Sequence, residues 1–197
     1  MDDLTTPAPA RRGWRVVDIV VAAVLGVACG LIFWAWNGIG YAWYDAMNAL
    51  TPGLGGVANG LWLLGGPLGG LIIRRPGAAL FVELVAAIVS TMFGNQWGIS
   101  TLWFGLAQGL GAEIALLVFA YRRFELPFAV FAGALAGVTS WASELVTGNM
   151  AKGAGFNTVY LVCDVVSGAV LAGVVAWALA RGLARTGVLG RFASGRT

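Results

Sequence analysis

The sequence contains no histidine, and only two cysteines occur among its 197 residues. The lack of histidine excludes imidazole-based catalysis and metal sites with histidine ligands. Cys29 and Cys163 lie far apart, each in an apolar run, which is typical of small buried hydrophobic residues rather than of a disulfide or a metal pair. The phosphate-binding motif G-x-x-x-x-G-K-[ST] and the HExxH and CxxC motifs are also missing. We therefore expect a chain that binds no metal or cofactor and does not itself hydrolyse ATP.

Charged residues are scarce as well. They make up 11% of the chain, whereas about a quarter is usual in a soluble domain. Hydrophobic residues make up 59%, and the mean hydropathy is +0.82. This composition predicts an all-α membrane protein that crosses the bilayer several times and forms a single domain.

Six apolar stretches approach the length of about 20 helical residues that crosses a hydrocarbon core about 30 Å thick. They are residues 16–36, 54–73, 78–94, 99–120, 127–146 and 156–180. The first is too long for the apolar core of a signal peptide and lacks a small-residue cleavage site, so we interpret it as a retained span. We expect a disordered cytoplasmic N-terminus at residues 1–13, a six-transmembrane-helix bundle at residues 14–183 and a cytoplasmic tail at residues 184–197.

The basic residues fall on one side of this arrangement. If the N-terminus is cytoplasmic, only Lys152 of the twelve cationic residues lies outside. Those inside are Arg11, Arg12, Arg15, Arg74, Arg75, Arg122, Arg123, Arg181, Arg185, Arg191 and Arg196. An excess of arginine in cytoplasmic segments predicts an even number of spans with both termini in the cytoplasm. Topology and anionic lipid account for the basic ends, so no nucleic-acid partner is expected.

Among the carboxylates in the apolar spans, four are candidates for function. They are Glu83, Glu113, Glu144 and Asp164. No lysine or arginine lies in the spans with them. An ionisable residue inside a span costs about 2.5–3.5 kcal/mol on insertion scales, so such residues are usually functional. These four are protonated, hydrogen-bonded to polar neighbours, or paired with a cation from outside, and we expect at least one to contact a ligand.

The third and fourth spans predict a helical hairpin with a polar turn at residues 94–98. Glu83 and Ser90 share one face of the first arm. One face of the second arm is formed, at helical spacing, by Trp97, Thr101, Phe104 and Gln108. Glu113 lies about 140° around the helix from Gln108, so the two need not point the same way.

Polar and aromatic residues gather near the predicted outer ends of the later spans. We interpret one group as a candidate pocket, namely Trp97, Trp141, Glu144, Asn157, Tyr160 and Asp164. Tryptophan rings beside carboxylates suit a flat, cationic heteroaromatic molecule, which gains cation–π contact and charge pairing. Amides such as those of Asn95 and Asn157 suit the edge of an aminopyrimidine ring. The alternative is that the tryptophans anchor the helices at the lipid interface and that the carboxylates are structural.

Small residues are the other recurring feature. Ala22, Gly26 and Gly30 form a smooth stripe on the first span, which permits close packing against another helix of this chain or against a separate membrane subunit. The span 54–73 holds seven glycines and one proline, so we predict that it is kinked or locally unwound. Residues 37–53 are expected outside, as an interfacial segment or as a lid over an outward-facing cavity.

Several motifs, in order along the chain, resemble one family of membrane proteins. They are PGAAL at 76–80 followed by Glu83, GNQWG at 94–98, QGLGAE at 108–113 and SGAVLAG at 167–173. With these motifs the chain resembles, over nearly its whole length, the YkoE-like S components of energy-coupling factor (ECF) ABC transporters, which are specific for thiamine or hydroxymethylpyrimidine.

The resemblance implies a six-helix bundle in the bacterial plasma membrane that binds thiamine or its hydroxymethylpyrimidine precursor and carries it inward by toppling. It implies a membrane coupling protein and two cytoplasmic ATP-binding subunits as partners. The stripe of Ala22, Gly26 and Gly30 matches the stripe that contacts the coupling protein in this superfamily. The signature polar residues are matched by Glu83, Asn95, Gln108 and Glu113. Other types of S component use a pocket histidine, which this chain lacks.

Two other functions remain open on the sequence. One is an intramembrane enzyme with Glu83 and Glu113 as an acid–base pair, although no nucleophile accompanies them. The other is a carrier of cations or protons that works alone, with the carboxylates as a relay.

The permanent charge on the thiazolium ring of thiamine suits unpaired carboxylates better than neutral hydroxymethylpyrimidine does.

Overall fold

The computed structural model describes residues 13–190 and 192–195, and within these residues every regular element is a helix, as the sequence predicts. The α-helices are α1 (Val16–Leu50), α2 (Gly65–Ile73), α3 (Ala78–Met92), α4 (Ser100–Val118), α5 (Leu126–Thr147), α6 (Gly153–Ser167) and α7 (Val175–Arg185). Three 3₁₀ helices, η1 (Leu54–Leu63), η2 (Asn149–Lys152) and η4 (Ala193–Gly195), and a π-helical stretch, η3 (Gly168–Val174), complete the set. Residues 1–12 of the expected disordered N-terminus lie outside the described residues.

Among the residues that the structure describes, five helical segments are long and apolar enough to cross a membrane. They are Val16–Leu50, Leu54–Ile73, Ser100–Val118, Leu126–Thr147 and Asn149–Arg185. The remaining predicted span corresponds to α3, an apolar helix of 15 residues. The chain is therefore a multi-pass membrane protein.

The first helix is longer than the predicted span. We expected the span to end at residue 36, but α1 continues to Leu50, so most of the predicted outer segment 37–53 is helical. No proline interrupts it before Pro52, and Thr51 leaves the helical conformation with a φ of −151°. The residue before a proline is disfavoured in the α conformation, which explains why the helix ends there.

The second span is broken, as its glycines predict. Its first half is the 3₁₀ helix η1, and its second half is α2. The hydroxyl of Ser167 accepts a hydrogen bond of 2.8 Å from the Gly60 N–H and donates one of 2.7 Å to the Val57 carbonyl. The irregular backbone is thus satisfied by contact within the protein, which is the condition for its survival at membrane depth.

The small-residue stripe on α1 faces α3 of the same chain. A Cβ on Gly26 would lie 2.5 Å from Cγ1 of Val85, and a Cβ on Gly30 would lie 2.6 Å from Cβ of Val89. Ala22 is also fully buried. In this structure the stripe of Ala22, Gly26 and Gly30 therefore packs against α3 of the same chain, which is the first of the two expected packing partners.

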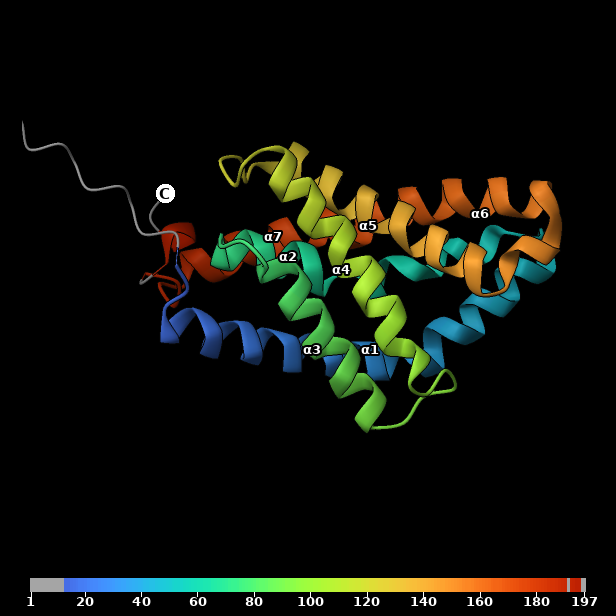
Figure 1. The fold of residues 1–197 in the computed structure, drawn as a ribbon, viewed down its shortest axis with the longest axis horizontal. Coiled ribbons are helices and arrows are strands. Elements are labelled where there is room, and N and C mark those ends of the chain that lie inside the picture. The colour runs from blue at the N-terminus through green and yellow to red at the C-terminus, as the bar shows by residue number, and fades with distance from the viewer. Residues whose placement is uncertain (1–12, 191, 196–197) are drawn as a thin grey trace, which may run out of the picture.

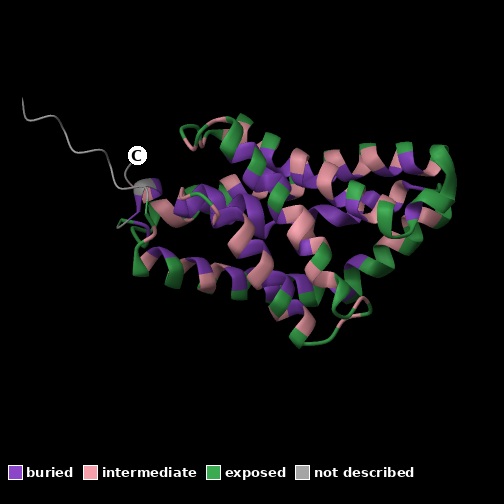
Figure 2. Ribbon diagram, in the orientation of Figure 1, coloured by how far each residue is buried: buried purple, intermediate pink, exposed green. Residues whose placement is uncertain are grey.

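The helices form an elongated bundle with two distinct ends. In Figure 1, α1 runs along one side, α5 and α6 run along the opposite side, and α2 and α7 lie between them near the end where the described residues begin and end. Figure 2 shows that buried residues follow the faces between helices, whereas exposed residues cover the outer faces. The start of the expected cytoplasmic tail packs back on the bundle, since Leu189 and Phe192 are buried and the Ser194 hydroxyl donates to the Ile72 carbonyl at 2.9 Å.

Candidate functional site

A cavity of about 560 Å³ lies toward the end of the bundle opposite the described termini. Its volume is in the range of small-molecule sites. Polar lining residues include Asn37, Asp45, Asn48, Asn59, Glu83, Ser90, Thr101, Gln108, Glu144, Asn149 and Lys152. Aromatic lining residues are Phe33, Tyr41, Tyr44, Trp62, Trp97, Phe104, Phe156 and Tyr160.

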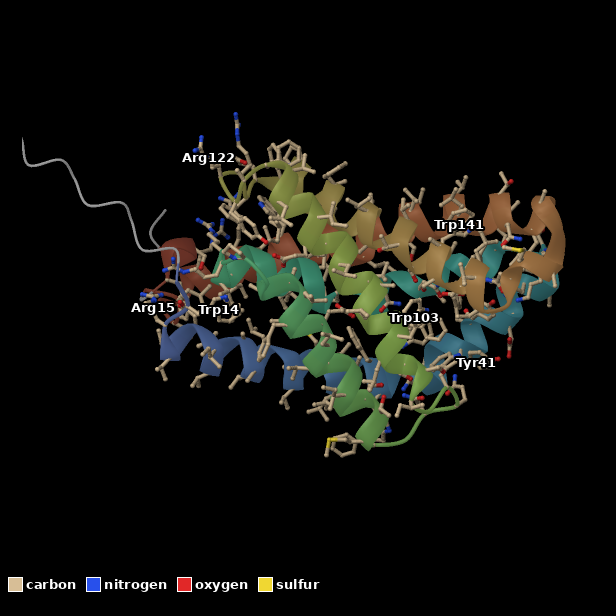
Figure 3. The ribbon with its side chains drawn as sticks, in the orientation of Figure 1. Trp14, Arg15, Tyr41, Trp103, Arg122 and Trp141 are labelled. Carbon is tan, nitrogen blue, oxygen red and sulfur yellow. The ribbon has the colours of Figure 1, made fainter. Side chains whose placement is uncertain are left out.

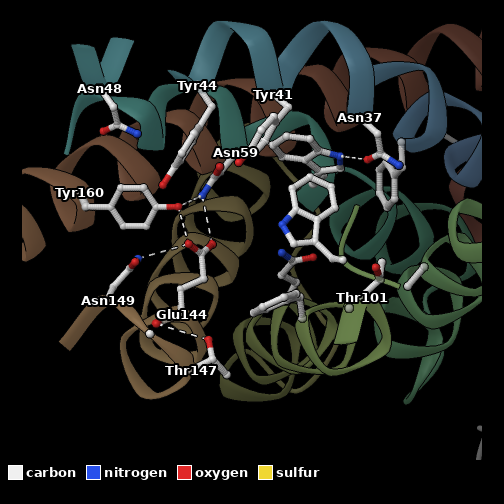
Figure 4. A pocket seen from close by; sticks show the side chains of 18 of the residues that line it. Asn37, Tyr41, Tyr44, Asn48, Asn59, Thr101, Glu144, Thr147, Asn149 and Tyr160 are labelled. Carbon is white, nitrogen blue, oxygen red and sulfur yellow. Dashed lines mark hydrogen bonds between the residues drawn. The ribbon is translucent and has the colours of Figure 1, made fainter. Parts of the chain in front are cut away.

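The carboxylate of Glu144 is the centre of a hydrogen-bond network in this cavity (Figure 4). Its Oε2 accepts a bond of 2.5 Å from the Tyr160 hydroxyl and one of 3.4 Å from Asn149 Nδ2. Its Oε1 accepts a bond of 3.3 Å from Asn59 Nδ2, which also donates to the Tyr160 hydroxyl oxygen at 2.7 Å. The network fixes the carboxylate in place, and such preorganisation lowers the cost of binding a ligand.

Glu83 lines the same cavity from α3 and is tied to the break in the second span. Its Oε2 accepts a hydrogen bond of 2.6 Å from the N–H of Gly66, in the first turn of α2. A Cβ on Gly65 would lie 2.9 Å from this oxygen, so a glycine permits the approach. Glu83 is 1% exposed, and its Oε1 has no hydrogen-bond partner among the described residues. This oxygen can accept a hydrogen bond from a ligand.

Aromatic rings form another part of the cavity lining. The ring of Trp97 meets those of Tyr41 and Trp62 edge to face, with centroids 5.6 and 5.4 Å apart. Trp62 Nε1 donates to Asn37 Oδ1 at 2.9 Å, and Asn37 Nδ2 donates to Ser90 Oγ at 3.0 Å, so the indole is held by a buried chain of bonds. In Figure 4, Asn37 and Thr101 lie on the opposite side of the cavity from Glu144 and Tyr160.

The cavity also contains the single lysine of the sequence. Lys152, which the sequence predicts to lie outside, lines the cavity with Asp45 and Glu144. Its Nζ lies 4.5 Å from the ring centroid of Phe156. Within residues 13–190 and 192–195, no group of three or more histidine, cysteine, aspartate or glutamate side chains is placed to hold a metal ion.

Five of the ten expected ligand residues line the cavity. They are Glu83, Trp97, Gln108, Glu144 and Tyr160. The face of the second hairpin arm is confirmed in full, because Thr101 and Phe104 line the cavity beside Trp97 and Gln108. Gln108 Nε2 donates to Ser140 Oγ at 3.3 Å, which orients its amide.

Glu113 does not line the cavity, because it is engaged at the start of α3. Its Oε1 accepts from the Gly77 N–H at 2.5 Å, and its Oε2 accepts from Ala79 and Leu80 at 3.1 and 3.4 Å. A carboxylate at a helix N-terminus satisfies N–H groups that have no partner within the helix and interacts favourably with the helix dipole. The structure therefore assigns Glu113 to the scaffold.

The other four expected residues also lie outside the cavity lining. Asn95 Oδ1 closes the hairpin turn by accepting from the N–H groups of Trp97 and Gly98. Trp141 Nε1 donates to the Asn157 carbonyl at 3.0 Å, and Asn157 Nδ2 donates to backbone carbonyls around η2. Asp164 is fully buried where α5 packs on α6 at Gly137.

The sequence analysis gave residues 37–53 as an interfacial segment or a lid over a cavity, but it did not single out the polar face at the end of α1. Asn37, Tyr41, Tyr44 and Asn48 follow one another at helical spacing, and all four line the cavity. Helical periodicity was the signal that could have found them, continued past residue 36. Asn59 was also missed, although it is the one polar side chain in the span 54–73.

Three comparisons relate the chain to known proteins. A family model described as "ABC-type cobalt transport system, permease component" matches residues 17–139. The putative HMP/thiamine permease protein YkoE of Bacillus subtilis (strain 168) is 33% identical over 190 residues, which cover 94% of this chain and 92% of that protein. The crystal structure of an S-component of an ECF transporter superposes with a TM-score of 0.78 at 31% identity, over 93% of this chain and 92% of that chain. The sequence and the fold therefore point to the same group of proteins along nearly the whole chain.

Proposed function

Because this chain belongs to the YkoE-like family of S components of ECF transporters, we propose that its cavity binds thiamine or its hydroxymethylpyrimidine precursor for uptake into the cell. The observation that carries this proposal is the Glu144 carboxylate, held by Tyr160 and Asn59 beside a wall of aromatic rings. Like its relatives, the chain is a transport subunit and not an enzyme.

The lining of the cavity fits the chemistry of this substrate class. The thiazolium ring of thiamine is flat and cationic, and it gains from a fixed carboxylate and from the faces of tryptophan and tyrosine rings. The aminopyrimidine ring, which both compounds share, carries hydrogen-bond donors and acceptors along its edge. The unpartnered Oε1 of Glu83 is an acceptor for the amino group, and the amide of Gln108 offers both a donor and an acceptor.

We further propose that all six apolar segments cross the bacterial plasma membrane, with both termini in the cytoplasm. The support is the distribution of charge, because Arg15 and Arg122 lie at the same end of the molecule (Figure 3), as do the arginines that follow α2 and end α7. Arginine-rich ends are normally cytoplasmic. In this orientation the substrate cavity lies toward the outer side of the membrane.

The proposed partners are a membrane coupling protein and two ATP-binding subunits, in addition to the lipid bilayer. The fold of an S component supports association with the other parts of an ECF transporter. The sequence carries no phosphate-binding loop, so ATP hydrolysis is assigned to those partners. Because α3 covers the stripe on α1, we propose that these partners contact another surface of the chain.

Equilibrium binding of radiolabelled thiamine to the purified chain, without ATP-binding subunits, tests the proposal. We expect saturable binding with no chemical change of the ligand. Formation of a product would support the acid–base enzyme instead, and a pH-driven current in liposomes would support the carrier that works alone. Quenching of intrinsic tryptophan fluorescence by thiamine and by hydroxymethylpyrimidine, measured side by side, identifies the preferred compound.

A further inference from the structure

A second cavity, of about 570 Å³, lies at the arginine-rich end of the molecule, away from the proposed substrate site. Four arginines from three parts of the chain line it, namely Arg74 after α2, Arg122 between α4 and α5, and Arg181 and Arg185 on α7. The only carboxylate among the described lining residues is Glu125. The lining therefore carries three more positive than negative charges.

Aromatic rings hold two of these guanidinium groups at the cavity wall. The Cζ of Arg74 lies 4.3 Å from the ring centroid of Phe124, and the Cζ of Arg181 lies 4.7 Å from that of Trp177. Both rings also line the cavity. Arg74 Nε also donates a hydrogen bond of 3.1 Å to the Leu71 carbonyl. Stacking on a ring fixes the plane of a guanidinium group, and N–H groups in that plane suit the oxygens of an anion. The cavity thus combines an apolar wall with oriented positive charge.

The position of this cavity matches the level at which membrane segments end. Arg74 directly follows the segment Leu54–Ile73, and Arg181 and Arg185 belong to the last turns of the segment Asn149–Arg185.

Burial lowers the pKa of Arg74, because its half-buried guanidinium is partly removed from water, and the charge of Glu125 acts in the opposite direction. A second negative charge beside Arg74 would compensate this loss of hydration further.

We propose that this cavity binds the phosphate-bearing headgroup of an anionic phospholipid, from the leaflet at the arginine-rich end. The arginines pair with the phosphate, and the apolar wall at Trp177 covers the start of an acyl chain. Basic pockets between membrane helices bind lipid headgroups in this way. A free phosphate ion would satisfy the arginines but would leave the apolar wall uncovered, which favours the lipid.

Native mass spectrometry of the purified full-length chain in neutral detergent tests the proposal. The chain is titrated with dioleoyl phosphatidylglycerol and, separately, with phosphatidylcholine of the same acyl chains. We expect the anionic lipid to bind about tenfold or more tightly than the zwitterionic one. Arg122→Gln and Arg181→Gln should each weaken its binding about fivefold, from about 1 kcal/mol per cationic residue.

Arg123→Gln is the matched control. This substitution removes the same charge at the position next to Arg122, but the Arg123 side chain contacts the Phe128 ring and does not line the cavity. We expect no change in lipid binding for this variant. An equal loss for Arg122→Gln and Arg123→Gln would show general surface charge only and would overturn the proposal. Displacement of the lipid by millimolar inorganic phosphate would show a free-phosphate site and would overturn it as well.

A photoactivatable phosphatidylglycerol gives a readout that does not depend on the variants. Peptide mapping should place the label on the wild-type chain near Phe124 and Trp177. Labelling confined to other segments would contradict the assignment. Neither experiment involves thiamine, so failure of the lipid site leaves the proposed transport function untouched, and the reverse also holds.

Discussion

The hydroxyl of Tyr160 on α6 donates a hydrogen bond of 2.5 Å to Oε2 of Glu144 on α5. Asn59 of η1 contacts both groups, with Nδ2 at 3.3 Å from Glu144 Oε1 and at 2.7 Å from the Tyr160 hydroxyl. Three elements from different parts of the chain therefore meet at one carboxylate. This meeting point orients the charge on which the proposed recognition of thiamine depends.

Replacing Glu144 with glutamine should weaken thiamine binding about tenfold or more. The substitution keeps the size of the side chain but removes the charge, and a hydrogen bond to a charged group contributes about 1.5–3 kcal/mol. Isothermal titration calorimetry measures the change. Glu125→Gln is the control, because Glu125 is an exposed carboxylate that does not line the proposed substrate cavity. Unchanged affinity in Glu144→Gln would remove this carboxylate from the substrate site.

Replacing Glu113 with alanine should lower stability and leave the affinity of the folded protein for thiamine unchanged. The N–H groups of Gly77, Ala79 and Leu80 lose their acceptor, and an unsatisfied buried donor costs about 1–3 kcal/mol. Thermal unfolding followed by tryptophan fluorescence measures the first effect, and titration with thiamine measures the second. Weaker binding at normal stability would return Glu113 to the list of ligand contacts.

Replacing Gly26 with alanine should destabilise the bundle, because its Cβ would collide with Val85 on α3. Overpacking of this kind costs about 1–3 kcal/mol. Gly38→Ala is the control on the same helix, since a Cβ there meets no atom within 4 Å. We expect Gly38→Ala to be neutral or stabilising by up to about 1 kcal/mol, because alanine favours the helix over glycine. Normal stability of Gly26→Ala combined with lost uptake would show instead that the stripe faces another subunit.

Replacing Trp97 with phenylalanine should reduce both the fluorescence quenching by thiamine and the affinity. Trp97 lines the cavity and gives the strongest cation–π contact of the natural side chains. A loss of severalfold in affinity is expected, from about 0.5–2 kcal/mol per contact. Trp103→Phe is the control, because Trp103 is 50% exposed and lies outside the cavity lining. Equal effects of the two substitutions would contradict the placement of the ligand beside Trp97.

The sequence predicted features that depend on neighbouring residues. Hydropathy located the apolar segments, and the spacing of Trp97, Thr101, Phe104 and Gln108 identified one cavity-lining face, because helical periodicity is local. The glycines of the span 54–73 identified its break for the same reason. The continuation of the first helix to Leu50 was not predicted, because Asn37 and the tyrosines that follow were interpreted by polarity alone.

Other features depend on contacts between distant segments, which a single sequence does not specify. Glu113 resembles a ligand residue until the start of α3 is placed beside it. The stripe at Gly26 permits close packing but does not say whether α3 or a separate subunit supplies the partner. Asp164 shares a helical face with Tyr160, one turn further along α6, but the cavity ends before that turn.

The tight winding of the second span has a consequence for the arrangement of its side chains. A 3₁₀ helix has three residues per turn and rises about 2.0 Å per residue, so side chains three positions apart are stacked in a single column. Asn59 and Trp62 are three positions apart in η1, and both line the cavity. An α-helix would turn the second away from the first by about 60°. The 3₁₀ helix therefore places the amide of Asn59 and the indole of Trp62 on the same side of the span, about 6 Å apart along its axis.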